Sequence, residues 1–403
     1  MRWYTAALLF TSISTALAPV ALAFGVIEVG GSASDLGLVL AARAAPQLLL
    51  LLVGGVVADR LPRHLILMAC GAIGVLTHAA AGLVIVAGSG SLWQLAALEI
   101  VNGAASAFSY PAMAGMLPQL VSRAQMARAS SITGLSRFAG FVLGGLVAGV
   151  LAAYVSSGVG LFAAAATMLA GTLLFIPLAS IPAPVFEGAR GHLGGQLAEG
   201  WRTFIGLRWL WVVVAGFCVV NMVSAGIWRT LGPVIATKSV GEAGWGLTIA
   251  LFSAGTAIGT LALMRVQPKH LLRAGVAAAA LEVPALAALG FPRLAVIAPL
   301  ALLAGCGVGY FSASWRTTLS REVPQDRLSR VSSIDGLGSF IAVPIGQIVA
   351  SQLYDRIGGR TVILLGASLT AVTISAMLAT APVRNLVFST DPVRLPAAAR
   401  RGA

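Results

Sequence analysis

Charged side chains are scarce in this sequence. Asp, Glu, Lys and Arg make up only 10% of its 403 residues, whereas 58% are hydrophobic and the mean hydropathy is +0.93. Soluble domains carry about a quarter charged residues. This composition excludes an ordinary soluble domain and predicts that most of the chain lies in a lipid bilayer.

Cysteine and histidine are also rare, with three and four residues respectively. The cysteines lie far apart in apolar stretches, and the histidines form no pair at helical spacing, so neither a disulfide framework nor a metal site is predicted. No clustered His/Asp/Glu or Ser/His set is present. We therefore expect no enzymatic activity and no cofactor.

Acidic residues are half as numerous as basic ones, 13 against 26, which gives a formal net charge of +13. A strongly basic chain can bind nucleic acid. Here, however, the basic residues lie in loops between apolar stretches, and no basic surface interleaved with aromatic residues is evident. The charge is interpreted as a topology signal, and no nucleic-acid partner is expected.

Long apolar stretches recur along the whole chain, each of about the twenty residues that span a bilayer as a helix. They predict an all-α integral membrane protein with twelve transmembrane helices, near residues 4–27, 36–57, 64–87, 92–117, 129–153, 158–181, 209–235, 245–265, 271–290, 294–319, 330–353 and 361–382.

Arginine is concentrated in alternate loops, such as those containing Arg60 and Arg63, Arg265, and Arg321. Because positively charged loops stay on the cytoplasmic side, both termini and the long middle loop are predicted to be cytoplasmic. The predicted location is a bacterial cytoplasmic (inner) membrane, with the chain crossing it many times.

The long loop divides the chain into four parts. We predict six-helix bundles over residues 1–181 and 209–383, a cytoplasmic linker over 182–208, and a disordered cytoplasmic tail over 384–403. Within the linker, Leu193, Leu197, Trp201, Phe204 and Ile205 recur at helical spacing. This pattern predicts an amphipathic helix on the inner membrane surface.

The two bundles share a sequence repeat. Arg128-Ala-Ser-Ser-Ile132 recurs as Arg330-Val-Ser-Ser-Ile334, at the start of the fifth helix of each half. Agreement at a constant offset of about two hundred residues indicates duplication of a six-helix unit.

A basic turn between the second and third helices carries the clearest motif. Gly55, Asp59, Arg60 and Arg63 form the pattern Gly-x-x-x-Asp-Arg-x-x-Arg. This pattern resembles the loop signature of major facilitator superfamily transporters, which implies their twelve-helix bundle of two pseudo-repeats. The resemblance further implies that these four residues, with Asp335 and Arg330 at the eleventh helix, form a cytoplasmic gate that switches conformation.

A second resemblance concerns exporters. Gly140, Gly144 and Gly145 follow Arg137 on the fifth helix and resemble the Gly-Pro-x-x-Gly-Gly motif of drug exporters, with Phe141 in place of the proline. Small residues at that spacing allow helices to pack closely. Phe108–Ala112 and the run beginning at Arg330 resemble exporters of the drug and siderophore type, including the enterobactin-exporter-like branch.

Ionisable residues within membrane spans are costly and need a partner or a watery cavity. Glu99 and Asp335 are the candidates for proton coupling, since desolvation favours a protonated carboxyl group. For Glu99 the alternative is a structural ion pair with Arg43 or Arg137. For Asp335 it is a stabilising acid near a helix N-terminus. Glu282, on the ninth helix, is expected to be peripheral.

Other polar and aromatic residues within the spans are candidates for lining a substrate cavity between the halves. They are Arg43, Asn102, Tyr110, Arg137, Asn221, Trp228, Arg229, Tyr310 and Ser314.

The sequence thus leads to a functional hypothesis. The chain is expected to be a monomeric secondary transporter that exports a small amphiphilic compound, such as a drug, siderophore or secondary metabolite, by alternating access coupled to protons. An importer or uniporter of a small metabolite and a transport-silent membrane receptor are the alternatives.

Overall fold

The computed structural model describes residues 1–88, 91–122, 125–180, 201–266 and 268–386. Within helices, the side chains of Leu52, Asp59, Ala127, Ser180, Gln325, Asp326 and Ser329 also lie outside the described part. The described residues are almost entirely helical and contain no β-strand. The predicted all-α class is confirmed.

The N-terminal half forms a bundle of six membrane-length segments, one of them divided into α2 and α3. Its helices are α1 (Arg2–Glu28), α2 (Ala33–Leu49), α3 (Leu51–Arg60), α4 (Arg63–Val86), α5 (Leu92–Leu120), α6 (Met126–Tyr154) and α7 (Ser157–Leu173), followed by a short 3₁₀ helix η2 (Ile176–Ser180).

The C-terminal half repeats this plan, with more interruptions. Its helices are α9 (Arg208–Ser224), the π-helix η3 (Ala225–Leu231), α10 (Gly232–Thr237), α11 (Gly241–Arg265), α12 (Leu271–Ala279), α13 (Glu282–Ala288), α14 (Leu294–Glu322), α15 (Gln325–Phe340), α16 (Val343–Ile357), α17 (Gly359–Ala379) and α18 (Ala381–Arg384).

Ten helical segments among the described residues are long and apolar enough to cross a membrane. The segment made of α2 and α3, interrupted at Leu50, and the 29-residue helix α5 are not among these ten. With these two, the segments correspond to the twelve predicted spans.

Two of the interruptions in the C-terminal half fall just before a proline. Pro284 follows the break between α12 and α13, and Pro344 follows the break between α15 and α16. Proline has no N–H to donate to the preceding turn and its ring crowds that turn, so the helix is broken there.

The seventh span contains a wide helical turn. Residues Ala225–Leu231 form a π-helix, in which Thr230 Oγ1 also donates to the Ala225 carbonyl oxygen, 3.2 Å away. Helices of this type are rare and concentrate at functional sites. Pro233 lies just beyond the wide turn, in the first turn of α10.

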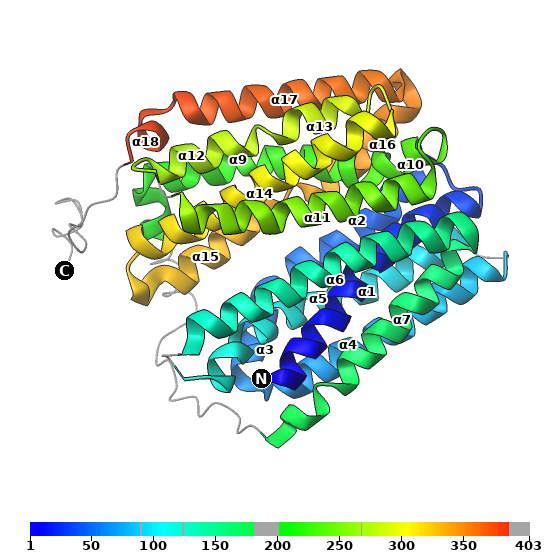
Figure 1. Ribbon diagram of the computed structural model, residues 1–403, viewed down its shortest axis with the longest axis horizontal. Helices are drawn as coiled ribbons and strands as arrows, with labels where there is room; N and C mark the ends of the chain where they lie inside the picture. Colours follow the sequence, from blue (N-terminus) through cyan, green and yellow to red (C-terminus); the bar gives the residue numbers. More distant parts are fainter. Residues whose placement is uncertain (89–90, 123–124, 181–200, 267, 387–403) are drawn as a thin grey trace.

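The two bundles lie side by side and meet mainly at one end (Figure 1). There, α2 packs on α16 and α6 packs on α11. We call this the closed end. The basic end is the opposite one, where the ends of α3, α4, α11 and α14 carry Arg60, Arg63, Arg265 and Arg321, and where the bundles diverge in Figure 1.

The hydrophobic cores follow the same division. One buried cluster joins residues of both bundles near the closed end, including Phe24 and Leu36 from one half and Trp228 and Trp245 from the other. Two further clusters, around Met116 and around Val213, each belong to a single half and lie toward the basic end. The bundles therefore share apolar packing only near the closed end, among the residues described.

Glycines allow the halves to touch at this end. A Cβ built on Gly149 of α6 would lie 2.6 Å from the Gly246 Cα of α11, and a Cβ built on Gly246 would lie 2.7 Å from the Gly149 Cα. Backbone cannot move aside as a flexible side chain can. The α6–α11 contact between the halves therefore requires both glycines.

We expect Gly246→Ala to destabilise the purified protein by about 1–3 kcal/mol, because the added methyl group overpacks this contact. The measurement is unfolding of purified variants in a non-ionic detergent. Gly336→Ala is the matched control, since a Cβ there meets nothing within 4 Å and helical Ala is favoured over Gly by about 1 kcal/mol. Equal stability of the two variants would contradict the close approach.

The predicted linker helix and tail lie largely outside the described residues. Residues 181–200, including Leu193 and Leu197, and residues 387–403 are not described, whereas 201–206 are helical. In that short helix Phe204 is buried against the C-terminal bundle, while Trp201 and Ile205 are exposed. The division into domains stays a prediction.

Candidate functional site

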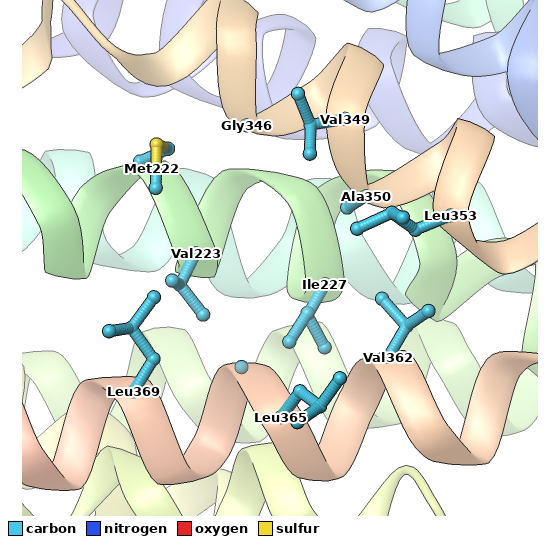
Figure 2. Close-up of a pocket in the computed structure, with 11 residues that line it drawn as sticks. Met222, Val223, Ile227, Gly346, Val349, Ala350, Leu353, Val362, Leu365 and Leu369 are labelled. Atoms are coloured by element: carbon cyan, nitrogen blue, oxygen red, sulfur yellow. The ribbon is translucent and has the colours of Figure 1, made fainter. Parts of the chain in front are cut away.

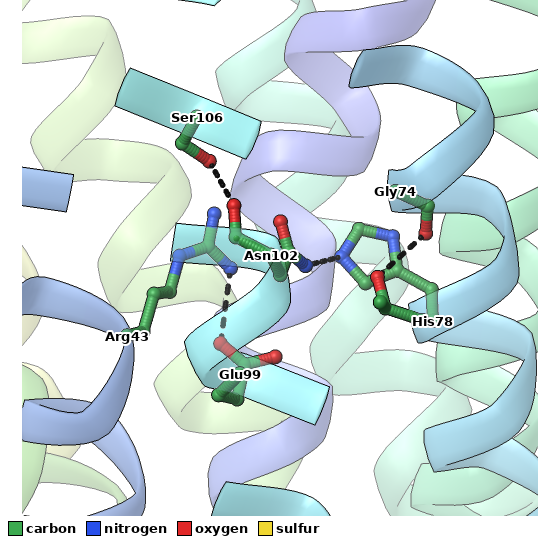
Figure 3. A network of polar contacts seen from close by, with 7 residues as sticks. Arg43, Gly74, His78, Glu99, Asn102 and Ser106 are labelled. Carbon is green, nitrogen blue, oxygen red and sulfur yellow. Dashed lines mark hydrogen bonds and ion pairs between the residues drawn. The ribbon is translucent and has the colours of Figure 1, made fainter. Parts of the chain in front are cut away.

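An arginine and a glutamate form an ion pair inside the N-terminal bundle (Figure 3). Arg43 Nη1 of α2 lies 3.4 Å from Glu99 Oε2 of α5, and it is the one ion pair between described side chains whose distance is within 4 Å. Glu99 is almost completely buried, whereas 19% of the Arg43 side chain is exposed. Of the two partners considered for Glu99, the structure pairs it with Arg43.

A glycine brings these two helices together. A Cβ built on Gly103 of α5 would lie 2.1 Å from the Arg43 carbonyl oxygen. Only glycine accommodates this approach, which places the Arg43 side chain within reach of α5.

Asn102 extends the same face of α5 toward α4. Its Nδ2 lies 2.8 Å from His78 Nε2, and Ser106 Oγ donates to the Asn102 carbonyl oxygen at 2.8 Å. Both Asn102 and His78 are buried. Asn102 therefore contributes to helix packing within the N-terminal bundle.

The C-terminal bundle contains a second buried acid. Glu282, at the start of α13, is 6% exposed and accepts a hydrogen bond of 2.6 Å from Ser224 Oγ, at the end of α9. Its charge also acts on Arg229 of η3. This residue was expected to be peripheral, and the structure corrects that expectation. The apolar residues on both sides of Glu282 in the sequence are the signal that could have indicated its burial.

Arg229 borders the space between the halves. Its side chain is accessible to solvent although the bundle surrounds it, and it makes no hydrogen bond or ion pair with a described residue. η3 packs on α2, and Arg43 is close enough to repel Arg229 electrostatically. The structure thus brings together two predicted cavity residues, one from each half.

These four charged residues lie at a similar depth. Counted from the helix ends at the closed end, each is roughly 9–15 Å into its span, at a rise of 1.5 Å per residue. The hydrocarbon core of a bilayer is about 30 Å thick. Arg43, Glu99, Arg229 and Glu282 therefore form a charged layer inside the membrane, nearer to the closed end than to the basic end.

Asp335 belongs to a separate polar cluster toward the basic end. Trp315 Nε1 donates to its Oδ2 at 2.9 Å and Ser339 Oγ donates to its Oδ1 at 3.1 Å. Asn221 Nδ2 in turn donates to the Ser339 carbonyl oxygen at 3.0 Å. Asp335 forms no ion pair with a described residue, and Trp315 was not recognised from the sequence.

The predicted gate residues lie at the basic end. The side chain of Asp59 is outside the described part, although its backbone is in the last turn of α3. Arg60 is exposed, and Arg63 donates to the Gly115 carbonyl oxygen of α5. A Cβ on Gly55 would meet nothing within 4 Å. Arg330, on α15, is partly buried.

The remaining cavity candidates lie in different environments. Trp228 is buried against Trp245, with ring centroids 5.3 Å apart, and Ser314 is fully buried, so both belong to the packed interior. Tyr310 Oη donates to the Val266 carbonyl oxygen at 3.2 Å. Tyr110 and Arg137 are exposed.

The three exporter-motif glycines lie at helix contacts. Cβ atoms on Gly140 and Gly144 would lie 2.7 Å and 2.4 Å from backbone oxygens of α1, and one on Gly145 would lie 3.0 Å from Ile249 of the other half. The first two allow α6 to approach α1, and the third faces the seam between the bundles.

An apolar groove lies within the C-terminal bundle between α9 with η3, α16 and α17 (Figure 2). Its volume is about 170 Å³, and its eleven lining residues, among them Ile227, Val349 and Leu365, are all apolar or glycine. Ligand sites usually include a few polar groups that fix orientation. This groove lacks such groups, so we place no substrate there.

Two helical bundles that meet at one end, with a charged layer where they meet, define the class of alternating-access membrane transporters. The chain belongs to the Major Facilitator Superfamily, whose family model matches residues 4–346. The resemblance drawn from the loop motif is confirmed.

One relative and several solved structures are similar over most of the chain. The multidrug efflux pump Tap of Mycolicibacterium fortuitum is 24% identical over 356 residues, covering 84% of this chain and 85% of that protein. A mutant of the nucleoside transporter NupG has a TM-score of 0.77 at 14% identity, covering 94% of this chain and 98% of that one.

Two further structures share the fold. A bacterial homologue of the human lysosomal transporter Spinster, inward-facing and occupied, has a TM-score of 0.72 at 15% identity, covering 96% of this chain and 98% of that one. A POT family transporter in complex with a peptide has a TM-score of 0.73 at 12% identity, covering 94% of this chain and 95% of that one. At these identities the likeness concerns the fold alone.

Proposed function

We propose that this transporter exports a small amphiphilic compound by alternating access, driven by inward proton flow. The observation that carries the proposal is the charged layer at the junction of the halves, where a substrate can reach both bundles at once. The similarity to a multidrug efflux pump supports the outward direction. In the cell, the basic end would face the cytoplasm of a bacterium, with both termini on that side.

The shape of the molecule supports the transport mechanism. The halves pack together at the closed end, and their helices diverge toward the basic end (Figure 1). Rocking of one bundle against the other would open the closed end and bring the ends of α3 and α15 together. Asp59, Arg60 and Arg63 on one side and Arg330 on the other would then form the gate at the basic end.

Asp335 is our primary candidate for the acid that takes up the proton. It is partly exposed and lies toward the basic end, where the helices of the two halves diverge, so a proton can reach it, whereas Glu99 is enclosed and bound to Arg43. Asp335 also accepts a hydrogen bond from Trp315 of the neighbouring helix α14, so its charge state affects contacts between elements of the C-terminal bundle. Protonation would bias the equilibrium between the two conformations.

The test is resistance to toxic amphiphiles in a pump-deficient bacterium that expresses the chain. We expect Asp335→Asn to abolish resistance at equal membrane levels, because the residue can then no longer change charge. Glu242→Gln, which alters an acid in the first turn of α11 near the closed end, is the matched control and should retain resistance.

Uptake of fluorescent amphiphiles into inverted vesicles should show the same pattern. Export that continues in Asp335→Asn with unchanged dependence on the proton gradient would contradict the assignment of the coupling acid. Transport in the opposite direction would contradict efflux itself and favour an importer.

A further inference from the structure

The charged layer contains two arginines from opposite sides of the junction between the halves. Arg43 comes from α2 of the N-terminal bundle and Arg229 from η3 of the C-terminal bundle, and these two elements pack together. Two positive charges on elements that pack together inside a membrane repel each other. An arrangement that costs free energy in the empty protein needs a compensating partner.

The partners of the two arginines are unequal. Arg43 is paired with Glu99 at 3.4 Å. Arg229 feels the charge of Glu282, but the Glu282 carboxylate is bound to Ser224, and Arg229 forms no ion pair with it. The side chain of Arg229 is therefore accessible, and no described residue accepts a hydrogen bond from its guanidinium donors.

The π-helix η3 has two different neighbours. Ile227 lies in the wall of the apolar groove of Figure 2. Arg229, two residues later, is not part of that wall, and η3 also packs on α2. Residues two apart on a helix do not share a face. The same short element thus contributes Ile227 to the apolar groove and an exposed charge at Arg229.

We propose that Arg43 and Arg229 together bind an anionic group of the transported substrate, such as a carboxylate, at the junction of the two bundles. Guanidinium groups bind planar oxyanions through paired hydrogen bonds. Because the two arginines come from different halves, an anion between them contacts both moving parts. The substrate class is then an amphiphile with one acidic group, a refinement that rests on the proposed transport function.

Glu99 and Glu282 act in this scheme as internal counter-ions. In the empty protein Glu99 neutralises Arg43, and a substrate anion must compete with that carboxylate. Proton-driven exchange then depends on Asp335, which lies in the separate cluster with Trp315 and does not compete with the anion directly. The two assignments can therefore fail independently.

The test uses three probes with the same apolar body and different charge: phenylbutyrate, phenylbutyramide and phenylbutylamine. Their binding to the purified full-length protein in non-ionic detergent is measured by calorimetry at constant ionic strength. We expect phenylbutyrate to bind about tenfold more tightly than the neutral amide, as for one additional charged hydrogen bond. The amine should bind most weakly.

Three variants distinguish a specific anion site from nonspecific binding of the probes. Arg229→Gln should remove the preference for phenylbutyrate, and it should fold because Arg229 holds no structural hydrogen bond among the described residues. Glu99→Gln should tighten phenylbutyrate binding severalfold, because it removes a competing charge while its amide oxygen can still accept from Arg43. Arg265→Gln, at the basic end of α11, is the matched control and should leave binding unchanged.

Equal affinity for the three probes, or no phenylbutyrate binding at millimolar concentration, would overturn the inference. So would an unchanged preference in Arg229→Gln, or weaker anion binding in Glu99→Gln. Anion binding without export in the resistance assay would contradict the proposed transport function alone. Export without charge preference would contradict the anion site alone.

Discussion

Replacing Glu99 with leucine is expected to destabilise the protein by about 3 kcal/mol, the cost of leaving a buried charge without its partner. Arg43 is then four-fifths covered without its carboxylate partner, and Arg229 on η3, which packs on α2, carries the same charge. The measurement is thermal unfolding of the purified protein, followed by size-exclusion chromatography. A large loss of monodisperse protein should accompany the lower melting temperature.

The double variant Arg43→Met with Glu99→Leu separates stability from function. Replacing both members of a buried ion pair with apolar residues is often neutral for stability or better, so the double variant should recover to within about 1 kcal/mol of the parent. Transport of the acidic substrate should nevertheless be lost in the double variant, because Arg43 is no longer present to bind it. If the double variant is as unstable as Glu99→Leu alone, the ion pair does not account for the loss.

The second large effect is expected from locking the closed end. Ser34 Oγ of α2 donates to Asp355 Oδ2 of α16 at 2.5 Å, across the junction of the halves. Cysteines introduced at both positions, in a chain whose three native cysteines are replaced by serine, should form a disulfide under oxidising conditions. Because alternating access requires this end to open, transport should fall to background.

Reduction of the disulfide provides the control for this experiment. Adding a reductant should restore transport to the level of the two single-cysteine variants, and mass spectrometry should confirm the cross-link. If the oxidised protein still transports at the parental rate, the contact between α2 and α16 persists through the cycle. The proposed rocking motion would then be wrong.

Much of the fold follows from local properties of the sequence. The twelve spans are predicted because each apolar run is long enough to cross a bilayer, and the repeat beginning at Arg128 and Arg330 indicates the two related halves. The pairing of Glu99 with Arg43 was one of two possibilities, since a buried acid must find a nearby base. The structure chooses Arg43 because Gly103 brings α2 against α5.

The parts that could not be predicted depend on how separate elements pack. The π-helix at Ala225–Leu231 was not predicted from a local sequence pattern, and it packs against α2, α16 and α17. The proximity of Arg229 to Arg43 requires the two halves to be placed first. Likewise, Trp315 meets Asp335 only through the relative rotation of α14 and α15.

The depth of the charged layer has an electrical consequence. With the basic end toward the cytoplasm, as the arginine distribution predicts, a substrate anion bound at Arg43 and Arg229 must still cross the closed end to leave, and export carries it across the whole membrane voltage. An inside-negative potential drives an anion outward, by about 2.3 kcal/mol per 100 mV for a full crossing, equivalent to an approximately fiftyfold concentration ratio. Export of such an anion is therefore electrogenic, and the resting potential of the cell itself becomes part of its driving force.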